Sequence, residues 1–114
     1  MIHILLHFAV PLVVALGIYR PAWRSAFLVM VATMVVDADH LLATPIYDPD
    51  RCSIGFHPLH TVPVIAVYAV LFAWPLVVQA RERDRDWPRR GRYIHLVGLG
   101  LLIHMALDWI DCLV

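Results

Sequence analysis

Three ionisable side chains interrupt a long apolar stretch in the first half of the chain. Asp37, Asp39 and His40 follow the apolar run 27–36 and are followed by two leucines. A carboxylate near the middle of a membrane helix costs roughly 2.5 to 3.5 kcal/mol, so two of them need compensating partners. Imidazole and carboxylate groups together bind zinc, manganese, iron or nickel. We interpret this motif as part of a metal site.

Further histidines and aspartates recur at helical intervals. Members of each pair lie three or four residues apart, which is the spacing of neighbours on one helix face. The pairs are His3 and His7, Asp37 and His40, His57 and His60, and His104 and Asp108. Helical bundles build metal sites from such pairs on facing helices. The sequence therefore predicts a site with one or two metal ions.

The predicted metal ligands are seven residues from four segments: His7, Asp37, His40, His57, His60, His104 and Asp108. Asp39 is one position off the face of its neighbours, and we predict that it is a catalytic general base or a residue that orients a ligand. We expect His3 to contribute little, because chain ends fray. His95 is interpreted as an interfacial residue and Asp111 as a solvated one.

The composition is that of an integral membrane protein. Of 114 residues, 61% are hydrophobic, and the mean hydropathy is +0.74, whereas soluble domains are typically about 45 to 50% apolar. The formal net charge is zero, which points to no nucleic-acid partner. Long apolar runs without period-two alternation predict helices, so the expected fold class is all-α.

The apolar runs predict four membrane-spanning helices that form one four-helix bundle. The spans are expected at about 3–19, 24–43, 60–80 and 93–113, and residues 1–114 are expected to be a single transmembrane domain. The loop 44–58 is rich in proline and aspartate and cannot continue a helix. This topology brings the predicted ligands to one face of the membrane.

The distribution of the arginines predicts on which side of the membrane this face lies. Two arginines follow the first span and six follow the third, whereas the loop 44–58 contains only Arg51. The positive-inside rule then places the first and third loops in the cytoplasm, and both termini and the loop 44–58 outside. Cys52 and Cys112 both fall on this outer, oxidising side, which predicts a disulfide between them.

The ordered motifs resemble a known family. His7, then Asp37-x-Asp39-His40, then the segment 57–61 (His-Pro-Leu-His-Thr), then His104-x-x-x-Asp108 is similar to the YdjM-like family of bacterial membrane-bound metal-dependent hydrolases. The whole chain also resembles a small four-span bacterial membrane family of unknown function with the same motifs. The resemblance implies a metal-dependent hydrolase in the bacterial inner membrane.

These observations lead to one functional prediction and two alternatives. The prediction is a membrane-embedded hydrolase, with zinc as the first choice of metal, that acts on a phosphoester or a lipid-like substrate. One alternative is a metal-binding membrane protein without catalysis. The other is a structural or partner-binding protein whose histidines and aspartates only pair with one another. The inner halves of the spans contain few polar groups, which disfavours transport.

Overall fold

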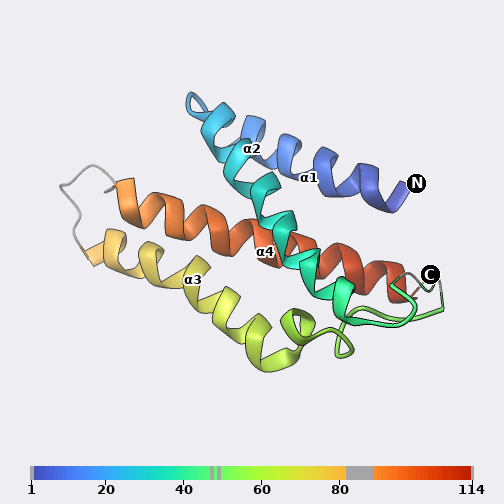
Figure 1. The fold of residues 1–114 in the computed structure, drawn as a ribbon. Helices are drawn as coiled ribbons and strands as arrows, with labels where there is room; N and C mark the ends of the chain where they lie inside the picture. The colour runs from blue at the N-terminus through green and yellow to red at the C-terminus, as the bar shows by residue number, and fades with distance from the viewer. Residues whose placement is uncertain (1, 47, 49, 82–88, 114) are drawn as a thin grey trace.

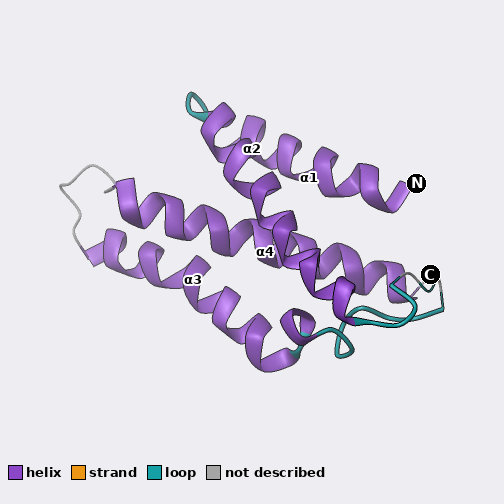
Figure 2. Ribbon diagram, viewed as in Figure 1, coloured by secondary structure: helices purple, strands orange, loops and turns teal. Residues whose placement is uncertain are grey.

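The computed structural model describes residues 2–46, 48, 50–81 and 89–113, and these residues are helical apart from turns and loops. In this described part of the chain, four α-helices and two 3-10 helices follow in order: α1 (Ile2–Ile18), α2 (Trp23–Ala32), η1 (Thr33–Leu42), η2 (Pro58–His60), α3 (Val62–Arg81) and α4 (Arg89–Leu113). Figure 2 shows no strand in the described part of the chain. The all-α prediction is confirmed.

Helix α4 is the element against which the others pack. It contacts α1, α2, η1 and α3. Both chain ends and the loop between η1 and η2 lie at one end of the molecule, and the turn between α1 and α2 lies at the other (Figure 1). Segments far apart in the sequence therefore meet at the end that carries the predicted ligands.

Within the described residues, three helical stretches are long and apolar enough to cross a membrane, and they are Trp23–Leu42, Val62–Arg81 and Arg90–Leu113. Helix α1 is apolar, but with 17 residues it is shorter than these. Large apolar side chains such as Leu5, Val67 and Trp74 are more than half exposed, as expected for surfaces that face lipid. The structure is thus consistent with a membrane protein.

The predicted spans differ from the helices in three places. The second span changes from α-helix to 3-10 helix at Thr33, whose hydroxyl donates a hydrogen bond to the Met30 carbonyl at 2.5 Å. The third helix begins at Val62, so that His60 lies before it. The fourth begins at Arg89, four residues earlier than expected.

Two glycines allow the helices to approach α4 closely. A Cβ at Gly98 would lie within 3 Å of the backbone of Leu71 and Phe72 in α3. A Cβ at Gly100 would lie 2.7 Å from the Thr33 hydroxyl oxygen. These contacts place the start of η1 directly against α4, and thereby bring the Asp37 motif to the level of His104.

The loop before α3 is fixed at both of its ends. Cys52 and Cys112 form the predicted disulfide, which ties the loop to the end of α4. Gly55 adopts a φ of 84°, a conformation that favours glycine, and its N–H donates to the His60 carbonyl at 3.0 Å. The Tyr68 hydroxyl donates to the Leu59 carbonyl at 2.9 Å. His60 is therefore held from both sides.

Candidate metal centre

The central group of ligating side chains comes from η1, η2 and α4. Asp37 Oδ1 lies 3.0 Å from His104 Nε2 and 3.4 Å from His60 Nε2. Asp108 Oδ2 lies 3.1 Å from His60 Nε2 and 3.3 Å from His104 Nε2. One ligating atom from each of the four residues lies within 4.8 Å of all the others. All but Asp37 are buried. The group could hold a metal ion.

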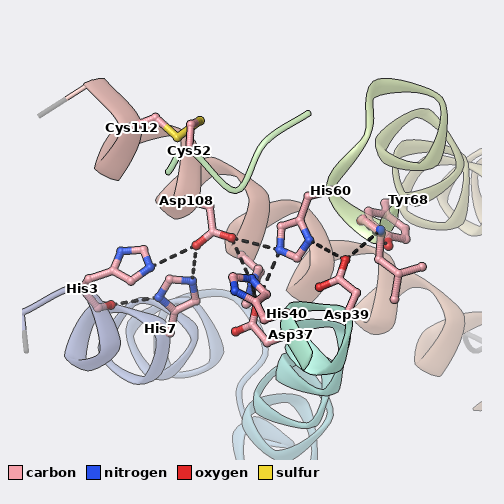
Figure 3. A network of polar contacts seen from close by, with 12 residues as sticks. His3, His7, Asp37, Asp39, His40, Cys52, His60, Tyr68, Asp108 and Cys112 are labelled. Carbon is pink, nitrogen blue, oxygen red and sulfur yellow. Dashed lines mark hydrogen bonds and ion pairs between the residues drawn. A yellow bond between two sulfur atoms is a disulfide. The ribbon is translucent and has the colours of Figure 1, made fainter. Parts of the chain in front are cut away.

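A second group shares Asp108 with the first. The other carboxylate oxygen of Asp108, Oδ1, lies 3.0 Å from His3 Nε2 and 3.3 Å from His7 Nε2. Figure 3 shows the Asp108 carboxylate between the α1 histidines on one side and His60 on the other. His3, His7 and Asp108 could together hold a metal ion. One carboxylate therefore faces two candidate sites, one with each oxygen.

The hydrogen bonds of two histidines determine which ring nitrogen is available. His7 Nδ1 lies 2.8 Å from the His3 carbonyl oxygen, which can only accept, so Nδ1 carries the proton. His60 Nδ1 donates to Asp39 Oδ2 at 3.0 Å. In both rings this leaves Nε2 facing Asp108. A histidine that donates one N–H to an oxygen and points its other nitrogen at the ion is the usual arrangement in metal sites.

Several of these atoms satisfy no hydrogen bond within the described residues. They are His7 Nε2, His60 Nε2 and Asp108 Oδ2, all of them buried. A buried polar atom without a partner costs about 1 to 3 kcal/mol. The contacts around Asp108 are thus short but lack hydrogen-bond geometry, and a shared cation would satisfy all three atoms. The donor set, nitrogen and carboxylate oxygen, fits a divalent transition metal.

A third group lies on the other side of His60. It consists of Asp39, His40 and His57, and it too could hold a metal ion. The rings of His40 and His57 are stacked with centroids 3.8 Å apart. Burial, together with the nearby His40 ring, lowers the pKa of His57. Because His40 Nε2 is also 3.2 Å from Asp37 Oδ1, this group adjoins the central one.

Asp39 is almost completely buried and connects η1 to η2. Its Oδ2 accepts hydrogen bonds from the Leu59 backbone N–H at 2.8 Å and from His60 Nδ1. The carboxylate therefore lies behind the His60 ring and not beside the central group (Figure 3). These contacts are those of a residue that orients a ligand.

A cavity of about 420 Å³ opens beside the three groups. Asp37, His40, His57 and Asp108 line it from the side of the candidate centre. Arg51 also lines it. Its guanidinium donates to the Pro45 carbonyl at 2.8 Å, lies over the Phe56 ring and is 4.0 Å from the Asp48 carboxylate. The cavity thus combines possible metal ligands with a positive charge.

The structure brings all seven predicted ligands to one end of the molecule but divides them among the groups. Four form the central group, His7 belongs to the second, and His40 and His57 belong to the third. The interpretation of His57 and His60 as one helix face is wrong. They flank a 3-10 turn closed by the bond from the His60 N–H to the His57 carbonyl, and they join different groups.

Two histidines were misjudged from the sequence. His3 contacts Asp108 directly, and its spacing of four from His7 was the signal that could have outweighed the expectation of a frayed end. His95 is only 2% exposed and is not interfacial. It accepts a hydrogen bond from the Tyr19 hydroxyl at 2.5 Å and donates to the Phe72 carbonyl at 2.9 Å.

Comparison with models of protein families identifies the family of this chain. The model of a family of unknown function, DUF6122, matches residues 1–80, more than two thirds of the sequence. The chain belongs to this family. The matched residues include every candidate ligand except the two on α4, His104 and Asp108. Comparison with curated proteins and with solved structures gives no match. The family has no known activity, so the hydrolase activity implied by the YdjM-like resemblance stays a prediction.

Proposed function

We propose that this protein is a membrane-embedded metal-dependent hydrolase with a two-metal His/Asp centre. One observation carries the proposal: Asp108 presents one carboxylate oxygen to His3 and His7 and the other to His60 and His104. A carboxylate flanked by histidines on both sides is suited to bridge two cations. Asp37 completes the central group, and zinc is the first candidate, with manganese, iron and nickel as alternatives.

The centre lies near the outer face of a single four-span bundle in the bacterial inner membrane. Three helical stretches are long enough to span, and α1 packs beside α2 and α4. A 17-residue apolar helix reaches about 26 Å, which a slightly thinned bilayer can accommodate. The arginine bias then orients the ligand-bearing end outward.

The chemistry follows from the cavity beside the centre. Metal bound here would polarise a substrate oxygen and lower the pKa of bound water towards about 7. Arg51 is placed to attract an anionic group, because its guanidinium lines the same cavity as Asp37 and Asp108. A phosphoester, including one carried by a lipid, has the matching charge. The side chains of the centre thus bind metal, and Arg51 binds the substrate anion.

Asp39 holds His60 in this scheme and is not the general base. Both hydrogen bonds of its Oδ2 go to the η2 segment, to Leu59 and His60. A general base must reach the attacking water. Asp37 meets this requirement better than Asp39, because its carboxylate is partly exposed and faces both the cavity and the ligands.

Metal-dependent phosphoester hydrolysis by the purified protein tests the proposal. The full chain, in detergent or lipid discs, is stripped with a chelator, reloaded with zinc or manganese, and given lipid and soluble phosphoesters. We expect turnover that requires metal and is lost in Asp37→Asn. The matched control is Asp50→Asn, which removes an exposed carboxylate of the adjacent loop. Turnover that survives both metal removal and Asp37→Asn would refute the proposal.

A second function is favoured by the burial of the ligands. His7, His60, His104 and Asp108 are each at most 5% exposed, which suits a closed structural metal site without catalysis. The same experiment separates the two functions, because a structural site would give metal-dependent thermal stability with no turnover of any phosphoester.

A further inference from the structure

A second cavity lies at the end of the molecule opposite the candidate metal centre. It has a volume of about 660 Å³ and is bounded by α1, α3, α4 and the turn after α1. Its walls are largely apolar and include Phe72, Leu76 and Leu99. This volume is within the range of about 300 to 1,000 Å³ that ligand sites occupy.

Two arginines line this otherwise apolar cavity. Arg20 comes from the turn after α1, and Arg92 comes from the first turn of α4. Arg92 donates to the Ala22 carbonyl at 3.4 Å, and in the described part of the chain neither guanidinium forms an ion pair with a carboxylate. Two positive charges from separate segments of the chain therefore border one hydrocarbon-lined space.

A polar pair, the buried His95 and the half-buried Tyr19, holds the walls of the cavity in place. His95 Nδ1 donates to the Phe72 carbonyl, so its Nε2 accepts the hydrogen bond of the Tyr19 hydroxyl. This chain of contacts connects the end of α1 to α4 and to the middle of α3. These contacts hold together the segments that line the cavity, including those that carry Arg20 and Arg92.

We propose that this cavity binds one anionic phospholipid, with an acyl chain along the apolar wall and the phosphate between Arg20 and Arg92. The apolar wall requires hydrocarbon and the arginines require a negative charge, and an anionic phospholipid supplies both. Basic pockets between membrane helices are known to hold anionic headgroups on the cytoplasmic side. The site requires none of the metal ligands, so it stands or fails apart from the proposed hydrolase.

Native mass spectrometry of the full chain in detergent tests this binding. The probes are phosphatidylglycerol, phosphatidylcholine and diacylglycerol with identical acyl chains. We expect one retained phosphatidylglycerol per chain, with the other two lipids retained at least tenfold more weakly. The double variant Arg20→Gln, Arg92→Gln should reduce the preference for phosphatidylglycerol roughly ten- to thirtyfold, as two headgroup contacts predict.

The matched control is the double variant Arg24→Gln, Arg90→Gln. It removes the same charge at the same end, but neither arginine lines the cavity. The control should retain phosphatidylglycerol as the unaltered protein does. Equal retention of the three lipids by the unaltered protein, or equal losses in the two double variants, would overturn the proposal. The comparison of lipids on unaltered protein decides the matter even if a variant fails to fold.

Discussion

The replacement Asp39→Asn tests whether the carboxylate behind His60 supports metal binding. Asparagine keeps the shape of the side chain and one oxygen that can accept from Leu59 and His60, but it removes the charge. Hydrogen bonds to charged groups contribute about 1.5 to 3 kcal/mol, and those between neutral groups about 0.5 to 1.5. The loss at His60 is therefore about 1 to 1.5 kcal/mol.

This loss corresponds to roughly a five- to tenfold weaker zinc affinity, since each 1.4 kcal/mol is a factor of ten. Replacing a group that orients a metal ligand usually lowers metal affinity about 10- to 100-fold, so the loss expected for Asp39→Asn lies at the lower end of that range. Asp39→Ala should cost more, up to about a hundredfold, because it also leaves the His60 and Leu59 N–H groups without acceptors.

Competition between the purified protein and a chromogenic zinc chelator measures these affinities. The control is Asp50→Asn, which removes an exposed carboxylate of the loop after η1 and should change the affinity by less than twofold. Circular dichroism confirms that each variant is helical. A zinc affinity of Asp39→Asn equal to that of Asp50→Asn would refute the positioning role of Asp39.

Three further predictions follow from the packing and the ligands. Gly98→Ala should destabilise the protein by about 1 to 3 kcal/mol, because the new methyl group would meet the α3 backbone. The control Gly17→Ala should not, because no heavy atom lies within 4 Å of its new methyl group. Urea unfolding in mixed micelles compares the two variants, and equal unfolding midpoints would contradict the close packing at Gly98. Reduction of the Cys52–Cys112 disulfide should weaken zinc binding, because the segment it anchors carries His57 and His60. If zinc affinity is unchanged after reduction, with free thiols verified by mass, the disulfide is not needed to position these histidines. Zinc affinity should fall as the pH is lowered through the ordinary imidazole pKa of about 6.5, because protons then compete with the ion for the neutral rings. An affinity independent of pH would exclude histidine ligation.

The fold was predictable where the sequence pattern is strong. Unbroken apolar runs predicted the four helices, and the intervals within the polar motifs predicted that histidines and aspartates meet at one end. The disulfide followed from topology alone, because both cysteines fall at the same end of alternating helices. These features depend on local sequence and on chain direction, which composition and spacing record.

The details of the site depend on tertiary contacts that spacing does not record. The change to 3-10 helix at Thr33 accompanies its close approach to Gly100 of α4. In a 3-10 helix residues three apart are eclipsed, which aligns Asp37 with His40. The two roles of the Asp108 oxygens depend on where the first turns of α1 lie beside α4. His95 was misread because its partner, Tyr19, is 76 residues away.

The number of metal ions per chain tests the central proposal most directly. Elemental analysis of the protein, purified in detergent, loaded with zinc and passed through a desalting column, gives this number. The proposed bridge predicts two zinc ions per unaltered chain and at most one in Asp108→Asn. Asp50→Asn should retain two, because that exposed carboxylate lies in the adjacent loop and belongs to none of the three groups. An unaltered chain with at most one zinc ion, or an Asp108→Asn variant that keeps two, would contradict a centre bridged by Asp108.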